Sequence, residues 1–349
     1  MLAAVVISLI PVSISYLKAV TSTYNVSWTI QSVEWLRNNG ANGLVSQVED
    51  WYYSLTAPAK GGPGLGSLPK AGLADSGVHP PPSISPVIHP ALPGEGVWHP
   101  ASRDPGLAGS LFVTTFRSEA DYPRLVAGVA WINGQRTRLS YVPGMQEPPS
   151  LPSRGSAEVP PALRRNLVAT FNGGFPLSTS NGGLVARGQT IAPMVNGAGT
   201  LVESASGKVD VVSWHGGPTA GPNVVFAKQN LPLIIDHGQK NPNLSDGPEW
   251  GATVGNAIRV WRSGVGVDRN GNLIYAAADT QTVGTLATIL QRAGAVRALE
   301  LDINQTWTSF ITYQHRYAHD PSNLLPDMVR SPSRYLTPDD RDFFAVYLK

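Results

Sequence analysis

The sequence predicts an α+β protein whose main part is a large, mainly antiparallel β-sheet domain with few helices. From about residue 111 onward, short apolar runs alternate with turn signals, and only one segment has a strong helical pattern. The chain before that point differs, because an apolar segment is followed by sequence rich in proline and glycine. We therefore predict four regions: a signal-anchor or signal helix at 1–22, a helical stalk at 23–56, a Pro/Gly-rich linker at 57–110 and the β-sheet domain at 111–349.

The N-terminal residues 2–20 are apolar apart from Lys18 and a few hydroxyl side chains. As a helix this segment is long enough to cross a bilayer, and as a soluble helix it would have no polar face. The basic segment that normally begins a signal peptide is missing. Three interpretations stay open: a membrane-anchoring signal, a cleaved signal or a buried core helix. The first two predict export, with the domain either anchored to the membrane through this helix or secreted.

Residues 28–55 have the pattern of two short amphipathic helices broken at Asn39-Gly40, typical of a stalk or of a partner-binding hairpin. Residues 57–110 are crowded with proline and glycine, which predicts an extended linker. Within it, only "GEGVW" at 94–98 has a composition suited to packing back onto the domain. We therefore expect the domain to fold without the first 100 residues.

Turn signals divide the rest of the chain into strands. Asn133-Gly134 and Asn270-Gly271 each separate two apolar runs, a pattern typical of β-hairpins. The runs predicted as strands are "LFVTTF", "RLVAGVAWI", "QRTRLSYV", "NLVATF", "KVDVVSW", "NVVFA", "LPLIID", "AIRVW", "GVGVDRNGNLIYAAA" and "FFAVYL".

One helix is predicted within this domain, at 282–294, "TVGTLATILQRAG". Its apolar positions recur at helical spacing, Thr282 is suited to cap its start, and Gly294 is suited to end it. It leads directly into the strand that has the most unusual polar pattern in the chain.

That pattern is in "RALELDINQTW", residues 297–307. In an extended chain, Glu300, Asp302 and Asn304 would lie on one face while the alternating leucines face a core. A carboxylate at the end of such a strand must be solvated, paired or used. Asp302 is therefore either the cap of a turn or a functional residue, and the polar row predicts the floor of a pocket.

Three further stretches have candidate binding residues. Asn172 precedes Gly173 in "ATFNGGFP", where glycines allow a ligand close to the backbone; an ordinary turn is the alternative. Arg262 lies beside glycines in "VWRSGVGVDRNG", an arrangement suited to bidentate binding of an oxyanion, although a surface arginine on an edge strand fits as well. His215 precedes two glycines and is suited to a pocket rim or a plain turn.

Composition excludes several other classes of function. The net charge is +2 and no long basic run occurs, so nucleic acid is not expected as a partner. The chain has no cysteine, which excludes disulfides, thiolate metal sites and cysteine nucleophiles. His315 and His319 are four residues apart but lack a nearby third ligand. We predict no metal site and no cofactor.

These stretches, in this order, resemble the phosphodiester glycosidase family over roughly residues 111–349. The Asn-Gly-Gly-Phe segment of the family is matched at 172–175, and its strand that ends in an aspartate is matched at Asp302. One departure is clear: much of the family continues with Gly-Gly-Gly-Ser, whereas this chain continues "INQTW". The other matching positions are Arg262, Ser263, Gly266 and Gly271 in the arginine strand, and Asp279 before the predicted helix.

The resemblance implies hydrolysis of a sugar phosphodiester at the anomeric carbon, here in a glycan of the cell envelope. The transition state has oxocarbenium character, which a carboxylate stabilises or attacks, while positive charge stabilises the phosphate that leaves. A non-catalytic module that binds anionic glycan on the same fold is the alternative. The roles implied are Asp302 as nucleophile or base, Asp279 as second carboxylate with Glu300 able to exchange with it, Arg262 on phosphate, and Asn172, Gly173, Asn304 and His215 on the substrate.

Overall fold

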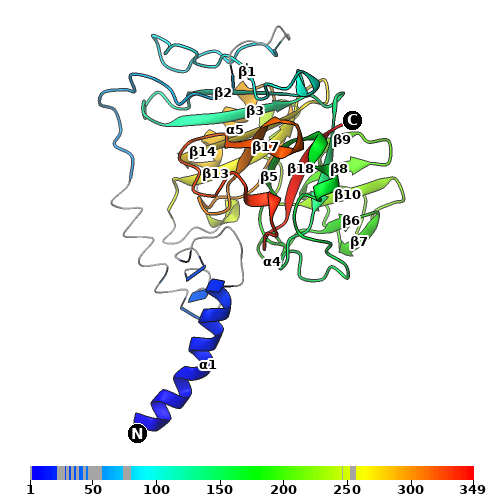
Figure 1. Ribbon diagram of the computed structural model, residues 1–349. Coiled ribbons are helices and arrows are strands. Elements are labelled where there is room, and N and C mark those ends of the chain that lie inside the picture. The colour runs from blue at the N-terminus through cyan, green and yellow to red at the C-terminus, as the bar shows by residue number, and fades with distance from the viewer. Residues whose placement is uncertain are drawn as a thin grey trace.

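The computed structural model describes residues 2–21, 57–73, 80–245, 247–251 and 257–349, with a few positions between 28 and 45. The prediction of a mainly antiparallel β-sheet domain with few helices is confirmed: three antiparallel sheets make up the described domain (Figure 1). The described helices are α1 (Leu2–Thr21), α4 (Leu177–Ser180) and α5 (Val283–Arg292), with short 3-10 helices at Pro105–Leu107, Pro161–Asn166, Pro248–Trp250, Arg316–Ala318 and Arg334–Leu336.

The largest sheet has eight strands in the order β1-β2-β3-β14-β13-β15-β11-β12. Strands β13 and β14 form the hairpin predicted at Asn270-Gly271, where Gly271 has a φ of +80° that favours glycine. The strands are β1 (His99–Pro100), β2 (Leu111–Arg117), β3 (Val126–Ile132), β11 (Ile235–Asp236), β12 (Gln239–Lys240), β13 (Val260–Val267), β14 (Leu273–Gln281) and β15 (Arg297–Glu300).

Helix α5 covers one face of this sheet. The Thr282 side chain accepts a hydrogen bond from the Thr285 amide, and the Thr285 hydroxyl accepts one from the Thr282 amide, which is a capping box. Leu286, Ile289 and Leu290 are fully buried in the core between the helix and the sheet. The predicted helix is therefore confirmed, because its cap and its apolar stripe are both local features of the sequence.

Two five-stranded sheets complete the domain, in the orders β7-β6-β10-β8-β9 and β17-β16-β5-β18-β4. Aromatic rings join the second of them to the free face of the large sheet: Tyr275 lies 5.5 Å from Phe171 and 4.8 Å from Phe310 between ring centroids. The strands are β4 (Thr137–Val142), β5 (Leu167–Asn172), β6 (Leu184–Ala186), β7 (Gln189–Ala192), β8 (Gly199–Ser204), β9 (Val209–Ser213), β10 (Val224–Gln229), β16 (Phe310–His315), β17 (His319–Asn323) and β18 (Phe343–Leu348).

The hairpin predicted at Asn133-Gly134 is wrong. A turn forms there, with the Asn133 carbonyl accepting from the amides of Arg136 and Thr137, but its two strands enter different sheets. Strand β3 pairs with β2 and β14, whereas β4 pairs with β18. Turn chemistry is local, but the choice of pairing partner depends on strands far away in the sequence.

Part of the predicted linker belongs to the domain. Ile84 and Trp98 are buried in the core beneath α5, and the Trp98 indole donates to the Pro82 carbonyl at 2.9 Å. Arg117 and Glu95 form a buried ion pair that holds this segment against β2. The domain therefore begins earlier than residue 111, and we no longer expect it to fold without the first 100 residues.

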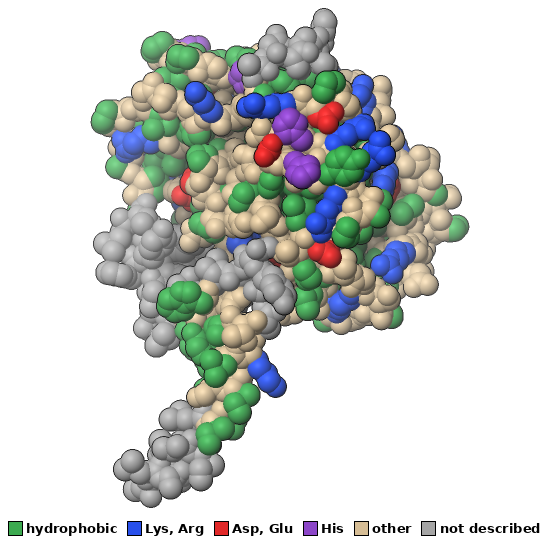
Figure 2. Space-filling model, in the orientation of Figure 1, with side chains coloured by type: hydrophobic (Ala, Val, Ile, Leu, Met, Phe, Trp, Pro, Cys, Tyr) green, Lys and Arg blue, Asp and Glu red, His purple; other side chains and the backbone are tan. Residues whose placement is uncertain are grey.

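Helix α1 is formed by the segment predicted as the signal or anchor helix. It projects from the sheets and has hydrophobic side chains along it (Figures 1 and 2). Its Ser15 hydroxyl accepts a hydrogen bond from the Trp35 indole at 3.0 Å. In the part of the chain that the structure describes, no helix is both long enough and apolar enough to span a membrane. Most of the predicted stalk at 23–56 lies outside the described residues.

Candidate active site

Strand register brings distant polar residues to one junction. Strand β18 pairs antiparallel with β5, so Phe343 lies opposite Asn172 and the residues just before β18 lie beside the end of β5. Strand β13 pairs antiparallel with β15, so the beginning of β13 lies beside the end of β15. The loops that leave β5 and β15 therefore meet the loop that enters β18.

Asn172 is buried and ties these strand ends together. Its Oδ1 accepts from the Tyr275 hydroxyl at 3.0 Å and from the Ser309 amide at 3.2 Å, and its Nδ2 donates to Ser263 Oγ at 3.1 Å. Ser263 Oγ in turn donates to the Asp302 carbonyl at 3.0 Å and accepts from the Asp302 amide at 3.1 Å. Asn172 and Asp302, both predicted as site residues, are thus linked through one serine. Asn172 has a structural role here, because its hydrogen bonds hold the ends of several strands together.

The predicted row of polar side chains does not form, because β15 ends at Glu300. Beyond it the Asn304 side chain accepts the Thr306 amide at 2.8 Å, and its carbonyl accepts the amides of Trp307 and Thr308. Asparagine readily makes such turns, which compete with an extended strand. Asp302 therefore lies in a loop at the sheet end, and Asn304 is half-buried in the turn that follows.

Asp302 is bonded through both carboxylate oxygens. Oδ1 accepts from the Ile303 amide at 2.8 Å, and Oδ2 accepts from Arg341 Nη2 at 3.2 Å. Burial raises the pKa of Asp302, and the positive charge of Arg341 offsets part of that rise. The side chain is only 5% exposed, so Asp302 is a desolvated carboxylate paired with a single arginine.

Arg341 is the residue of this junction that has unused donors. Its Nη2 donates to the Gly174 carbonyl at 2.9 Å as well as to Asp302, and its guanidinium lies 4.7 Å from the centre of the Trp307 ring. Among the described residues its Nε has no hydrogen-bond partner. With 15% of the side chain exposed, the guanidinium can accept a further anion.

Glu147 is a second carboxylate near Arg341. Its Oε1 accepts from the Leu177 amide at 2.8 Å, two residues beyond the Asn-Gly-Gly-Phe segment. Burial raises the pKa of Glu147, the charge of Asp342 adds to the rise, and Lys228 and Arg341 oppose it. The structure thus provides two buried carboxylates, Asp302 and Glu147, that both interact with Arg341.

A buried ion pair supports the loop between these carboxylates. Lys228 of β10 pairs with Asp342, which also accepts from the Tyr141 hydroxyl at 2.8 Å. The Gly173 amide donates to the Asp342 carbonyl at 3.1 Å, and a Cβ at Gly173 would lie 2.6 Å from that oxygen. Gly173 is therefore required by close packing rather than by the substrate contact that the sequence predicts.

The structure gives Arg262 a different role from the predicted phosphate contact. Its Nη1 forms a buried ion pair with Glu300 Oε1 at 2.6 Å, and its nitrogens also donate to the carbonyls of Gln281, Trp250 and Ile258. The space beside Gly264 is filled, since a Cβ there would lie 2.9 Å from Leu290 of α5. Arg262 and Glu300 thus lie on the helix-covered face of the sheet, where all three guanidinium nitrogens are engaged.

Glu300 is completely buried, and only one of its oxygens has a partner among the described residues. Burial raises its pKa to about 7 even though the Arg262 charge lowers it. This is the strongest perturbation of any carboxylate near the junction. Its cause is the desolvated core under α5, so the exchange of roles with Asp279 that the sequence left open has no support in this geometry.

Asp279 and His215 lie apart from the junction. Burial raises the pKa of Asp279, Thr280 opposes the rise, and the nearest charge that acts on it is Asp327. His215 is exposed after β9, in a different sheet, where its Nε2 lies 3.3 Å from Ser213 Oγ. Over the described residues, neither one is bonded to Asp302, Arg341 or Glu147, so their predicted site roles are not supported by contacts.

The fold and the junction together define a β-rich domain with a carboxylate–arginine site. The family model described as phosphodiester glycosidase matches residues 165–302, which confirms the resemblance seen in the sequence. The matched segment includes both Asn172 and Asp302, the two predicted residues that the structure links through Ser263. Arg341 and Glu147 lie outside it.

Three solved structures are similar to the chain. The zebrafish N-acetylglucosamine-1-phosphodiester alpha-N-acetylglucosaminidase catalytic domain, auto-inhibited by its pro-peptide, has 16% identity and a TM-score of 0.43 over 71% of this chain and 86% of that one. A hypothetical protein from Synechocystis has 14% identity and a TM-score of 0.42 over 69% of this chain, which spans 62% of that protein. A putative exported protein from Burkholderia pseudomallei has 12% identity and a TM-score of 0.37, over 64% and 74% of the two chains. No curated protein matches the chain.

The sequence contained a weak signal for one of the residues that its motifs missed. Arg341 lies in "PDDRDFF", a charged run directly before the last strand, and charge at a strand entrance is a common property of loops. Glu147 lies in a proline-rich loop with no distinguishing neighbour. Both residues join the junction only because β18 pairs with β5 and the 147 loop reaches the Leu177 amide.

Proposed function

We propose that this protein hydrolyses a sugar phosphodiester at the anomeric carbon, releasing the sugar and a phosphate monoester. The observation that supports this most directly is the Asp302–Arg341 pair, in which Nε of the guanidinium has no hydrogen-bond partner among the described residues. A carboxylate stabilises the oxocarbenium-like centre, and a guanidinium binds the phosphate oxygens as they gain charge. The carboxylate of Asp302 and the guanidinium of Arg341 provide these two groups, and one hydrogen bond joins them.

In this proposal Asp302 acts either as the nucleophile that attacks the anomeric carbon or as the base that deprotonates the attacking water, and Arg341 takes the phosphate role predicted for Arg262. Glu147 replaces Asp279 as the second carboxylate, because it is buried near Arg341 and burial raises its pKa. The bond from the anomeric carbon to the phosphate oxygen breaks, and a water oxygen bonds to that carbon. The proton that water loses goes to a carboxylate, and the phosphate leaves as an anion.

A non-catalytic module that binds anionic glycan is the second candidate. It is favoured by the extent to which Asp302 is already bonded, since both of its oxygens accept hydrogen bonds and little of the side chain is exposed. The bulkier "INQTW" in place of the family's glycines points the same way, because Ile303 is buried against Phe175. We also propose that the substrate is a glycan of the cell envelope and that the protein is exported, on the basis of the apolar N-terminal segment.

The decisive experiment incubates the full chain with a panel of sugar-1-phosphodiesters and measures the free sugar and the phosphate monoester. Equal amounts of both products, lost in Arg341→Ala but retained in the exposed control Arg269→Ala, would support the enzyme. Calorimetric binding of the same compounds without product would favour the binding module. If no compound of the panel is hydrolysed and none binds, both candidates are eliminated.

A further inference from the structure

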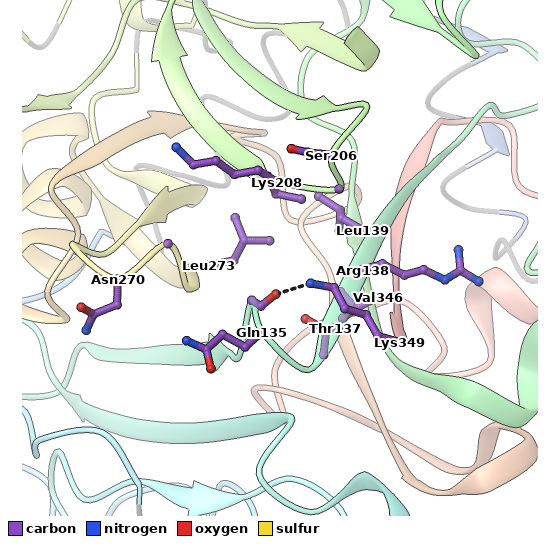
Figure 3. A pocket seen from close by; sticks show the side chains of 14 residues that line it. Gln135, Thr137, Arg138, Leu139, Ser206, Lys208, Asn270, Leu273, Val346 and Lys349 are labelled. Atoms are coloured by element: carbon purple, nitrogen blue, oxygen red, sulfur yellow. Dashed lines mark hydrogen bonds between the residues drawn. The ribbon is translucent and has the colours of Figure 1, made fainter. Parts of the chain in front are cut away.

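A second pocket lies at the other end of the large sheet, and its volume is about 290 Å³ (Figure 3). Three turns surround it: the β3–β4 turn at Gly134, the β8–β9 turn at Gly207 and the β13–β14 turn at Gly271. Ser263 and Asn270 are seven residues apart along β13 and its turn, so at roughly 3.3 Å per residue the pocket is about 20 Å from the Ser263–Asp302 junction. It is therefore separate from the candidate active site.

The floor of this pocket is apolar. Leu139, Leu273 and Val346 line it, and all three also belong to the main hydrophobic core between the sheets. Figure 3 shows their side chains around the cavity, among the polar residues of the surrounding turns. A ligand that enters the pocket would therefore bury apolar surface against the core, which favours an apolar body.

The rim of the pocket is cationic. Arg138, Lys208 and Lys349 line it, and its lining contains no acidic side chain. Lys349 Nζ donates to the Gly134 carbonyl at 2.7 Å, which is the dashed contact in Figure 3, and Arg138 lies 4.7 Å over the Tyr347 ring. Neither contact neutralises a charge, so both cations keep donors for an anion.

Two carboxylates lie near the rim and reduce its charge only in part. Asp210 is 3.2 Å from Lys208 Nζ, but it also pairs with Arg297, so one carboxylate serves two cations. Glu203 interacts with the charges of Arg138 and Lys349, and it is half-buried beside them rather than in the pocket. The positive charges at the rim outnumber the negative ones.

We infer that this pocket binds a small amphiphilic anion, in which a phosphate or carboxylate group is attached to an apolar body. The anionic group would lie near Lys208 and Lys349, and the apolar body would lie on Leu139 and Leu273. This site goes beyond the proposed hydrolysis and does not depend on it.

The test is calorimetric titration of the full chain at low salt with 1-naphthyl phosphate, 1-naphthoate, 1-naphthol and inorganic phosphate. Naphthyl phosphate or naphthoate should bind more tightly than naphthol or phosphate alone, and their relative affinities identify the preferred anionic group. Lys208→Ala and Lys349→Ala should each weaken binding by roughly fivefold, as expected for exposed charge pairs. Lys240→Ala removes an exposed lysine elsewhere and should change nothing.

Binding in this pocket is distinguished from binding at the candidate active site by titrating each ligand into both Lys208→Ala and Arg341→Ala. A ligand held in the second pocket loses affinity in Lys208→Ala and keeps it in Arg341→Ala, whereas one held by Arg341 does the reverse. Three results would overturn the inference: no naphthyl anion binds, naphthol binds as tightly as the anions, or Lys240→Ala weakens binding as much as Lys208→Ala. None of them bears on turnover of a sugar phosphodiester, so failure here leaves the proposed function untouched.

Discussion

Two carboxylate–arginine pairs lie two residues apart along one segment, and they differ in what surrounds the arginine. Glu300 pairs with Arg262 inside the sheet, where backbone carbonyls accept from the remaining guanidinium nitrogens. Asp302 pairs with Arg341 beyond the end of β15, where Nε of the guanidinium has no partner among the described residues. A paired charge is therefore informative about function only when the unused donors of its partner are also known.

The largest expected effect separates the two carboxylates by turnover. Asp302→Asn removes the charge that an oxocarbenium centre requires, so turnover should fall by about three orders of magnitude or more while the melting temperature changes little. Glu300→Gln, two residues away on the covered face, should keep most of its activity. Both quantities are measured on one preparation of each variant. Full activity in a stable Asp302→Asn protein would remove this residue from the mechanism.

The next effect separates the two arginines by stability. Arg262→Met leaves Glu300 buried without its partner, so the free energy of unfolding should fall by about 3–5 kcal/mol in chemical denaturation. Arg341→Met should cost less, because 15% of that side chain is exposed and Asp302 keeps the hydrogen bond from the Ile303 amide. The double variant Arg262→Met/Glu300→Leu should recover much of the loss. If Arg341→Met proves the more destabilising, our division into a structural and a functional pair is wrong.

A smaller effect tests substrate preference. Only a phosphodiester presents an oxyanion to the guanidinium of Arg341. Arg341→Ala should therefore lower kcat/KM for sugar phosphodiesters by a factor that corresponds to about 1.5–3 kcal/mol of activation free energy. Aryl glycosides of the same sugar should lose much less. Competition between the two substrate types in a single reaction measures the difference directly. An equal loss on both would point to a positioning role for Arg341 instead.

The smallest effect concerns pH. The pKa of Glu300 is about 7 in the fold against an ordinary 4.5, so between these values the folded state binds more protons than the unfolded chain. The free energy of unfolding should therefore fall as pH rises through that window, and Glu300→Gln should flatten the decline by up to about 1.4 kcal/mol per pH unit. Denaturant titrations at several pH values check this. Asp302 and Glu147 also have raised pKa values, so a weaker decline of the same sign should remain. A decline of unchanged steepness in Glu300→Gln would show that Glu300 is not its source.

Features encoded within a few residues were predicted correctly. The Asn270-Gly271 hairpin and the capped helix α5 each depend on contacts between near neighbours in the chain. The Asn133-Gly134 turn shows the limit, because its turn formed while its strands entered different sheets. The same limit applies to the proline-rich segment before residue 111, where Trp98 is buried by a core that lies more than ten residues downstream.

For the candidate site, the sequence by itself determined that Asn172 and Asp302 are polar residues at strand ends, with two glycines directly after Asn172, because strand alternation and turn chemistry are local properties. Only the tertiary structure decided what each of them contacts. Arg341 reaches Asp302 across 39 residues because β18 pairs with β5, and Arg262 loses its predicted role because Glu300 and backbone carbonyls engage it and α5 fills the space beside Gly264. The physical reason is that the charge environment of a side chain is set by burial and by partners brought in through sheet pairing, and neither is encoded in sequence spacing.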